Sequence, residues 1–240
     1  MKCFLINLDK NQDRLKYMDA QLKKLGVEYE RFPGILGAGL CKSELKKAHN
    51  AFRGLLVNGG RLTKGEVGCA MSHNGIYKRI VETGVDKAIV LEDDVALSDR
   101  FPSIIEDASR FVDPKRKQVI LFSGHALSQE ECEKESGVVS ISGGTCADAY
   151  MITRLAAMAI LAGNDPVVTV CDRWIRFQKR YGVEMYRVFP ITARQDKAQF
   201  PGSNVSEFPT RPRGFALFVR KLIRAVELFI DWIIFLFTGR

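Results

Sequence analysis

The sequence predicts an α/β fold, and three observations support this prediction. Short apolar runs typical of buried strands alternate along the chain with segments whose apolar residues recur at helical spacing. A strand, a helix and a second strand fit into about the first thirty residues, as in the opening of a βαβ unit. The run Ala88–Leu91 is followed directly by Glu92, Asp93 and Asp94, which is typical of a buried strand whose C-terminal end opens into a ligand cleft.

The elements of the first third follow from local patterns. A buried strand is expected over Lys2–Leu8, followed by a helix with apolar residues three or four positions apart from Leu15 to Leu25. Gly26 stands where that helix should stop. A second strand is expected over Val27–Phe32. The next stretch contains many glycines, and within it we expect one short helix near Ser43–Phe52.

A long helix is expected to precede the acidic run. Thr63 and Glu66 have the spacing of a capping box, so the helix should begin there. It should continue to about Glu82 and stop at Gly84, before the strand Lys87–Leu91.

The second half should continue the alternation of strands and helices. Further helices are expected around Ile104–Phe111 and Leu155–Leu161. The remaining strands are expected at Val119–Phe122, Val138–Ile141, Ala147–Ile152 and Glu184–Phe189.

Length and charge divide the chain into a domain and a tail. A length of 240 residues suits one globular domain, which we place at residues 1–210, followed by a segment at 211–240. The net charge is +8, and residues 211–240 contribute six basic and two acidic residues, hence half of it. Because the excess charge gathers in an apolar tail, nucleic-acid binding is disfavoured.

Residues 215–237 of this tail suggest a basic amphipathic helix. They contain eighteen apolar and five charged residues, and four of the charged residues fall on one helical face. The longest uncharged run is too short to span about 30 Å of hydrocarbon. We expect the helix to lie on an anionic inner-membrane surface; the alternative is packing onto the domain or another subunit.

The six cysteines favour a reducing compartment. None forms a Cys-x-x-Cys pair, so a zinc ribbon or a redox motif of that kind is not expected. The N-terminus enters the first strand directly, without the apolar region of a signal peptide. We therefore expect a cytoplasmic protein, peripherally associated with the inner face of the cytoplasmic membrane.

The acidic run Glu92-Asp93-Asp94 is the main candidate for chemistry. Carboxylates crowded at a strand end repel one another unless a cation joins them, and a divalent metal carrying a diphosphate is the natural candidate. The alternative is a solvated acidic turn. The chain has neither a G-x-G-x-x-G fingerprint nor a P-loop, so no glycine-rich cradle is available for the phosphates.

Two other segments carry candidate binding residues. Asn7 and Arg14 follow the first strand, where a nucleotide could bind, although Arg14 could be a plain surface charge. Ser72 and His73 lie in the long helix among small residues and could contact a ligand; the alternative is a packing role, with His73 at the surface.

Two aspartates are candidates for a general base. Asp172 stands between an apolar run and an expected helix, and it could either cap that helix or accept a proton from an acceptor hydroxyl. Asp148 is unusual within a strand-like run, and exposure on an edge strand would explain it without any catalytic role.

Taken together, these segments resemble a known family. The segments "FLINLDKNQDR", "LTKGEVGCAMSHNGIYKRIV", "AIVLEDDVAL" and "ADAYMITRLAAMAIL" resemble the successive blocks of glycosyltransferase family 25, the family of bacterial lipooligosaccharide galactosyltransferases. The match covers roughly residues 2–200 in the family's order and spacing. It implies a GT-A-type nucleotide-diphospho-sugar transferase fold, a divalent metal (Mn²⁺ or Mg²⁺), a UDP-sugar donor and an inverting transfer.

The resemblance also implies roles for particular residues. Asp93 and Asp94 match the metal-binding carboxylates, and Glu92 belongs to the same acidic motif. Asn7 and Arg14 match a block near the nucleotide, Ser72 and His73 match a serine–histidine pair, and Asp172 matches an acidic position that suits the base. Many GT-A enzymes supply a late histidine to the metal, but no histidine follows residue 125 here. Gln195, Asp196, Ser203 or water are the substitutes.

Three functions remain open on this basis. The first is a metal-dependent transferase that moves a hexose, such as galactose from UDP-galactose, onto a lipooligosaccharide or lipopolysaccharide core or similar glycan. The second is a non-catalytic sugar-nucleotide- or glycan-binding scaffold at the membrane. The third, a metal-dependent phosphohydrolase, is disfavoured because the chain has only three histidines.

Overall fold

The central sheet contains strands running in both directions. The computed structural model describes residues 1–124 and 137–201. Within them, seven strands pair in the order β2-β1-β3-β7-β5-β8-β6, and β4 pairs with β9 in a separate sheet. The strands are β1 (Lys2–Asn7), β2 (Glu30–Pro33), β3 (Lys87–Glu92), β4 (Val95–Leu97), β5 (Gln118–Leu121), β6 (Gly137–Ser140), β7 (Ala149–Thr153), β8 (Glu184–Phe189) and β9 (Ala193–Gln195). β1 runs parallel to β2 and β3, whereas β7 runs antiparallel between β3 and β5.

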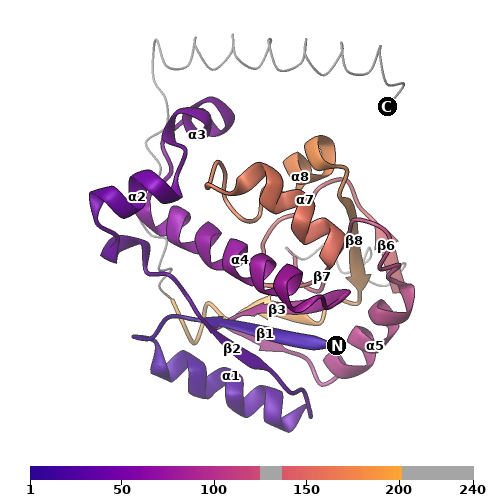
Figure 1. Ribbon diagram of the computed structural model, residues 1–240. Coiled ribbons are helices and arrows are strands. Elements are labelled where there is room, and N and C mark those ends of the chain that lie inside the picture. The colour runs from indigo at the N-terminus through magenta and orange to yellow at the C-terminus, as the bar shows by residue number, and fades with distance from the viewer. Residues whose placement is uncertain (125–136, 202–240) are drawn as a thin grey trace, which may run out of the picture.

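Helices cover both faces of this sheet (Figure 1). α4, α7 and α8 pack on one face, and α1 and α5 pack on the other. The helices are α1 (Gln12–Lys24), η1 (Gly37–Gly39), α2 (Lys42–Ala48), α3 (Ala51–Asn58), α4 (Lys64–Thr83), α5 (Phe101–Phe111), α7 (Arg154–Asn164) and α8 (Trp174–Tyr181). This mixed α/β arrangement is compatible with the predicted GT-A-type fold.

Alternate residues of the strands build two separate cores. Phe4 and Val90 face the helices α4, α7 and α8, where Trp174 is fully buried. Leu5 and Leu91 face α1 and α5 on the other side. Because β1 and β3 are buried on both faces, their apolar runs are continuous, as the sequence predicted.

The predicted boundaries of α4 are confirmed. Thr63 Oγ1 accepts a hydrogen bond from the Glu66 amide, and the Glu66 carboxylate accepts one from the Thr63 amide. Gly84 ends the helix in the left-handed conformation, with a φ of 69°. α4 therefore has a fixed start and end, and it carries Ser72 and His73, of which His73 contacts Glu92 at the end of β3.

Two sequence predictions in the first third were wrong in detail. The second strand begins at Glu30 rather than Val27, because residues 26–29 first turn the chain out of α1. The single helix expected near Ser43–Phe52 is two helices. His49 is extended and bridges to Val167, and Asn50 then caps α3 by accepting a hydrogen bond from the Arg53 amide.

The tail prediction lies outside the described residues. This applies to the segment 211–240, including the amphipathic helix expected at 215–237, and to Ser203. Among the helices of residues 1–124 and 137–201, none is long and apolar enough to cross a membrane.

Candidate functional site

The acidic run lies where two parallel strands end together. Glu92 is the last residue of β3 and pairs with Ile6 of β1, so Asn7 and Asp93 come side by side at the same edge of the sheet. Asp93 and Asp94 form the turn between β3 and β4. The carboxyl ends of parallel strands are the usual position for ligands in α/β sheets.

Asp93 is held by two buried partners. Its Oδ2 accepts a hydrogen bond of 2.8 Å from Nδ2 of Asn7, and its Oδ1 accepts one of 3.1 Å from Nη1 of Arg14. Both of its oxygens are therefore engaged. The interpretation of Arg14 as a plain surface charge was wrong, since only 9% of the residue is exposed.

Asp94 differs from Asp93 in having a carboxylate oxygen without a partner. Its Oδ2 accepts hydrogen bonds from Arg14 Nη1 at 3.2 Å and from Gln195 Nε2 at 3.1 Å. Its Oδ1 is buried and has no hydrogen-bond partner among the residues that the structure describes. A buried polar atom of this kind calls for an explanation, and a bound cation is one.

The acidic turn opens into a cleft with about 640 Å³ of empty space, here called the β1–β3 cleft. Its walls include Arg14, Glu92, Asp93, Asp94, Ser72, His73, Gln195 and residues 34–37. Asn7 is not among them: it is fully buried and supports Asp93 from behind. Asn7 would therefore reach a ligand in this cleft only through Asp93, and its place near a nucleotide stays a prediction.

Ser72 positions one wall of this cleft. Its Oγ accepts a hydrogen bond of 2.8 Å from the Ile35 amide and donates one of 2.8 Å to the Gly68 carbonyl. The small residues of α4 permit this approach, because a Cβ on Gly68 would lie 2.5 Å from the Gly37 nitrogen. Both properties agree with the close backbone contact predicted for this part of the helix.

The two base candidates line a neighbouring hollow with about 800 Å³ of empty space, here called the Asp172 hollow. Asp148 and Asp172 both lie in its wall, and it shares Cys69, Glu92 and Gln195 with the β1–β3 cleft. A ligand in one cavity could therefore meet a ligand in the other beside Glu92.

The structural alternatives for these two aspartates are wrong. The residue capping α8 is Arg173, and the helix start has no side-chain cap, so Asp172 does not cap it. Asp148 is 5% exposed and leads into β7, which is a central strand rather than an edge strand. Burial raises the pKa of the Asp148 carboxyl, although its hydrogen bond from Ser123 Oγ opposes the rise.

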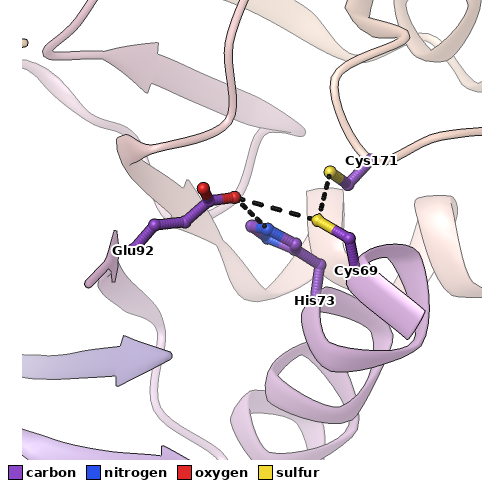
Figure 2. A group of neighbouring side chains, drawn as sticks. All are labelled: Cys69, His73, Glu92 and Cys171. Carbon is purple, nitrogen blue, oxygen red and sulfur yellow. Dashed lines mark hydrogen bonds and ion pairs between the residues drawn. The ribbon is translucent and has the colours of Figure 1, made fainter. Parts of the chain in front are cut away.

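Glu92 belongs to a different group from its two neighbours. Figure 2 shows it with Cys69, His73 and Cys171, and we call these four residues the thiol–histidine cluster. His73 Nε2 lies 3.1 Å from Glu92 Oε1, and Cys69 Sγ lies 3.5 Å from Cys171 Sγ. The alternative that placed His73 at the surface is wrong, since the residue is 1% exposed.

Burial and mutual contact shift the pKa values within this cluster. Burial, together with the charge of Cys69, raises the pKa of the Glu92 carboxyl to about 8. Burial by itself lowers the pKa of His73, but contacts with Cys69 and Glu92 raise it to about 10 overall. The contact with Cys171 lowers the pKa of the Cys69 thiol. Within this cluster, the pKa of each of these three groups therefore depends on its neighbours.

Sequence reasoning missed both cysteines of this cluster. The four-residue spacing of Cys69 and His73 on one helix could have pointed to Cys69. Nothing local points to Cys171, which is 102 positions away from Cys69. Of the late residues suggested for a metal, Gln195 contacts Asp94, whereas the Asp196 carboxylate accepts a hydrogen bond of 2.7 Å from the Tyr17 hydroxyl.

Several known proteins are similar to this chain. Human procollagen galactosyltransferase 2 is 31% identical over 105 residues, covering 41% of this chain and 16% of the relative. The human protein named inactive glycosyltransferase 25 family member 3 is 30% identical over 167 residues, covering 67% of this chain and 27% of the relative. The chain thus spans about a quarter or less of the length of these relatives.

Among solved structures, "Crystal Structure of A197 from STIV" superposes with a TM-score of 0.43 at 13% identity, covering 80% of this chain and 84% of that chain. This likeness is too weak to support a conclusion about the fold.

The family itself is shown by a match over most of the chain. The family model described as "Glycosyltransferase family 25 (LPS biosynthesis protein)" matches residues 1–175. That span contains β1, α1, α4, β3 and the acidic turn, and thus both aspartates of the β1–β3 cleft. The chain belongs to glycosyltransferase family 25.

Proposed function

We propose that this protein is a metal-dependent inverting glycosyltransferase that moves a hexose from a nucleotide-diphospho-sugar to a hydroxyl of a glycan. One observation carries the proposal. Asp94 lines the cleft where β1 and β3 end and contacts the cationic side chain of Arg14 through Oδ2, while its buried Oδ1 has no hydrogen-bond partner within residues 1–124 and 137–201. That combination suits a diphosphate held by a divalent cation.

The residues present fit a hard cation at Asp94 better than at Asp93. Mn²⁺ and Mg²⁺ prefer oxygen ligands and bind through one or two carboxylates plus substrate phosphates. Asp94 can offer Oδ1 without losing a hydrogen bond, whereas Asp93 would have to release Asn7 or Arg14. When bound, the cation supplies positive charge that offsets the charge developing on the leaving diphosphate.

The protein's own groups would do the rest of the chemistry. Arg14 lines the cleft and adds a fixed positive charge close to the phosphates. Asp172 is exposed in the wall of the neighbouring hollow, so an incoming acceptor can reach it. We assign Asp172 as the base that takes the acceptor's proton, with Asp148 as the second candidate because burial raises its pKa.

The donor and acceptor are proposed from the relatives. Two features support galactose from UDP-galactose and a lipooligosaccharide or lipopolysaccharide acceptor: a relative named procollagen galactosyltransferase 2 and the family description as an LPS biosynthesis protein. A basic, apolar tail at residues 211–240 would then keep the enzyme at the inner face of the cytoplasmic membrane, near a lipid-linked acceptor.

A non-catalytic scaffold is the second candidate function. It is favoured by the 30% identity to the human protein named inactive glycosyltransferase 25 family member 3. Such a protein would bind a sugar nucleotide without turning it over.

Turnover separates these candidates. The full chain is mixed with UDP-galactose, UDP-glucose or UDP-N-acetylglucosamine, with and without Mn²⁺, and UDP release is measured with and without a truncated lipooligosaccharide acceptor. We expect Mn²⁺-dependent release with one donor. In Asp94→Asn the Mn²⁺ affinity should fall by at least about 10–100-fold, the range seen when even an outer partner of a metal is lost. Binding of a UDP-sugar without any release would support the scaffold, and full activity of Asp94→Asn would remove the metal assignment.

The tail proposal has its own test. Deleting residues 214–240 should move the protein from the membrane fraction to the supernatant, and an unchanged distribution would overturn it.

A further inference from the structure

We propose that Cys69, His73, Glu92 and Cys171 bind a zinc ion, in a site separate from the cation position at Asp94. The four side chains come from three parts of the fold: Cys69 and His73 from α4, Glu92 from the end of β3, and Cys171 from the turn before α8 (Figure 2). The zinc site depends on these residues alone and does not require that the protein transfer a sugar.

The spacing of the donor atoms fits a tetrahedral ion. One ligand atom from each residue lies within 4.8 Å of all the others. The separations are 3.1 Å from His73 Nε2 to Glu92 Oε1, 3.5 Å between the two sulfurs, and 3.9 Å from Cys69 Sγ to Glu92 Oε1. Zinc with bonds of about 2.0–2.3 Å places its ligand atoms roughly 3.3–3.8 Å apart, so no pair of donor atoms has to close by more than about 1 Å.

The chemistry of the donors selects zinc over the harder cations. Two thiolates and an imidazole are soft or borderline ligands, which suit Zn²⁺ and not Mg²⁺ or Mn²⁺. Asp94 presents the opposite case, a carboxylate in the lining of the β1–β3 cleft whose only donor atoms are hard oxygens. Zn²⁺ should therefore bind at the thiol–histidine cluster, and Mn²⁺ or Mg²⁺ should bind at Asp94.

The surroundings of His73 orient it as a ligand. Its Nδ1 lies 2.8 Å from the Tyr150 hydroxyl, which in turn lies 2.9 Å from the Tyr77 hydroxyl. Metal-binding histidines are usually held in this way by a partner on their other ring nitrogen. The contact leaves Nε2 directed at Glu92 (Figure 2).

A disulfide between Cys69 and Cys171 explains less of the structure. It would shorten the sulfur separation from 3.5 Å to about 2.05 Å. It would not explain why His73 and Glu92 lie next to the two sulfurs. A closed four-ligand zinc site accounts for all four side chains. It would also hold residues 170–173, and hence Asp172, against α4 and β3, which is a structural role.

Cobalt spectroscopy of the full chain tests the site. The protein is stripped of metal under a non-thiol reductant and titrated with Co²⁺, whose tetrahedral thiolate complexes absorb strongly in the visible and near-ultraviolet. We expect one thiolate-bound ion per chain, displaced by one equivalent of Zn²⁺ and independent of any nucleotide sugar. Absence of the sulfur-to-cobalt band in the reduced wild-type protein would overturn the proposal.

Variants identify the ligands. Cys171→Ser and Cys69→Ser should each weaken Zn²⁺ binding by at least about 10–100-fold and reduce the sulfur-to-cobalt band. Cys171 lies in a turn, so its substitution should disturb the fold less than a substitution within α4. Cys41→Ser is the matched control, because Cys41 is exposed and outside the cluster, and it should leave the band unchanged. Survival of the full band in both Cys69→Ser and Cys171→Ser would refute the site. Asp94→Asn should keep the band while losing Mn²⁺-dependent transfer, so failure of the proposed function and failure of the zinc site give different results.

Discussion

Nη1 of Arg14 lies 3.1 Å from Oδ1 of Asp93, so that a residue in the first turn of α1 is joined to the end of β3, 79 positions away in the sequence. Both side chains are about nine-tenths buried. Removing one member of a buried ion pair costs more than removing one member of an exposed pair, although Arg14 also keeps Asp94 at 3.2 Å.

Asp93→Ala should therefore destabilise the protein by about 1–3 kcal/mol, because Asn7 and Arg14 each lose a buried hydrogen-bond partner while Arg14 keeps its ion pair with Asp94. Urea unfolding monitored by circular dichroism measures this. Asp99→Ala is the control, since its pair with Lys24 is exposed on both sides and should contribute less than about 1 kcal/mol. Equal destabilisation by the two substitutions would contradict the assigned role of the Arg14–Asp93 pair.

Asp172→Asn should lower kcat by about 10²–10⁴-fold while the KM for the nucleotide sugar stays close to that of the wild type. The side-chain amide of Asn cannot take the proton from the hydroxyl of the acceptor glycan. The residues that contact the nucleotide sugar in the β1–β3 cleft are unchanged. Initial-rate kinetics with varied donor and acceptor separate the two constants. Asp107→Asn, on the exposed face of α5, is the control. If Asp172→Asn retains the wild-type kcat, Asp148 becomes the base to test.

Gly37→Ala should disturb the wall of the β1–β3 cleft. A Cβ at this position would lie 1.7 Å from the Lys64 carbonyl oxygen, so the turn at residues 37–39 must move away from α4. We expect a loss of stability of about 1–3 kcal/mol and a higher KM for the donor. Gly39→Ala is the matched control two residues on, with nothing within 4 Å of the added Cβ. Comparable defects in both variants would show that the close contact with Lys64 is not the cause.

The contribution of Glu184 to stability should depend on pH. Partial burial raises its pKa, but hydrogen bonds from Gln118, Arg116 and Tyr186 outweigh this and lower it below the ordinary value. A lowered pKa means stability that is present above the unfolded-state pKa of about 4.3 and lost as the pH falls through the folded-state pKa.

Glu184→Gln should accordingly be less stable than the wild type near pH 7, by under about 1 kcal/mol because the pair with Arg116 is partly exposed. The difference should shrink as the pH falls below about 4.3. Thermal unfolding at a series of pH values measures it. A difference that grows towards low pH would mean that folding raises the pKa of Glu184 instead of lowering it.

The sequence alone determined the elements whose signals are local. The apolar runs of β1 and β3, the capping box at Thr63 and Glu66, and the glycine stop at Gly84 each act over a few residues, so they could be interpreted without knowing the fold. The division between α2 and α3 could not be predicted from local signals. It is fixed by the contact of His49 with Val167, which lies far along the chain.

Only the tertiary structure decided how the run Glu92-Asp93-Asp94 is used. Neighbouring side chains at the end of a strand point in different directions, so Glu92 meets His73 of α4 while Asp93 meets Asn7 and Arg14. Cys171 reaches Cys69 because α8 packs on the same face of the sheet as α4, a relationship that no spacing in the sequence contains. The type of each residue was visible from the start, but the partners that give each carboxylate its chemistry come from distant segments.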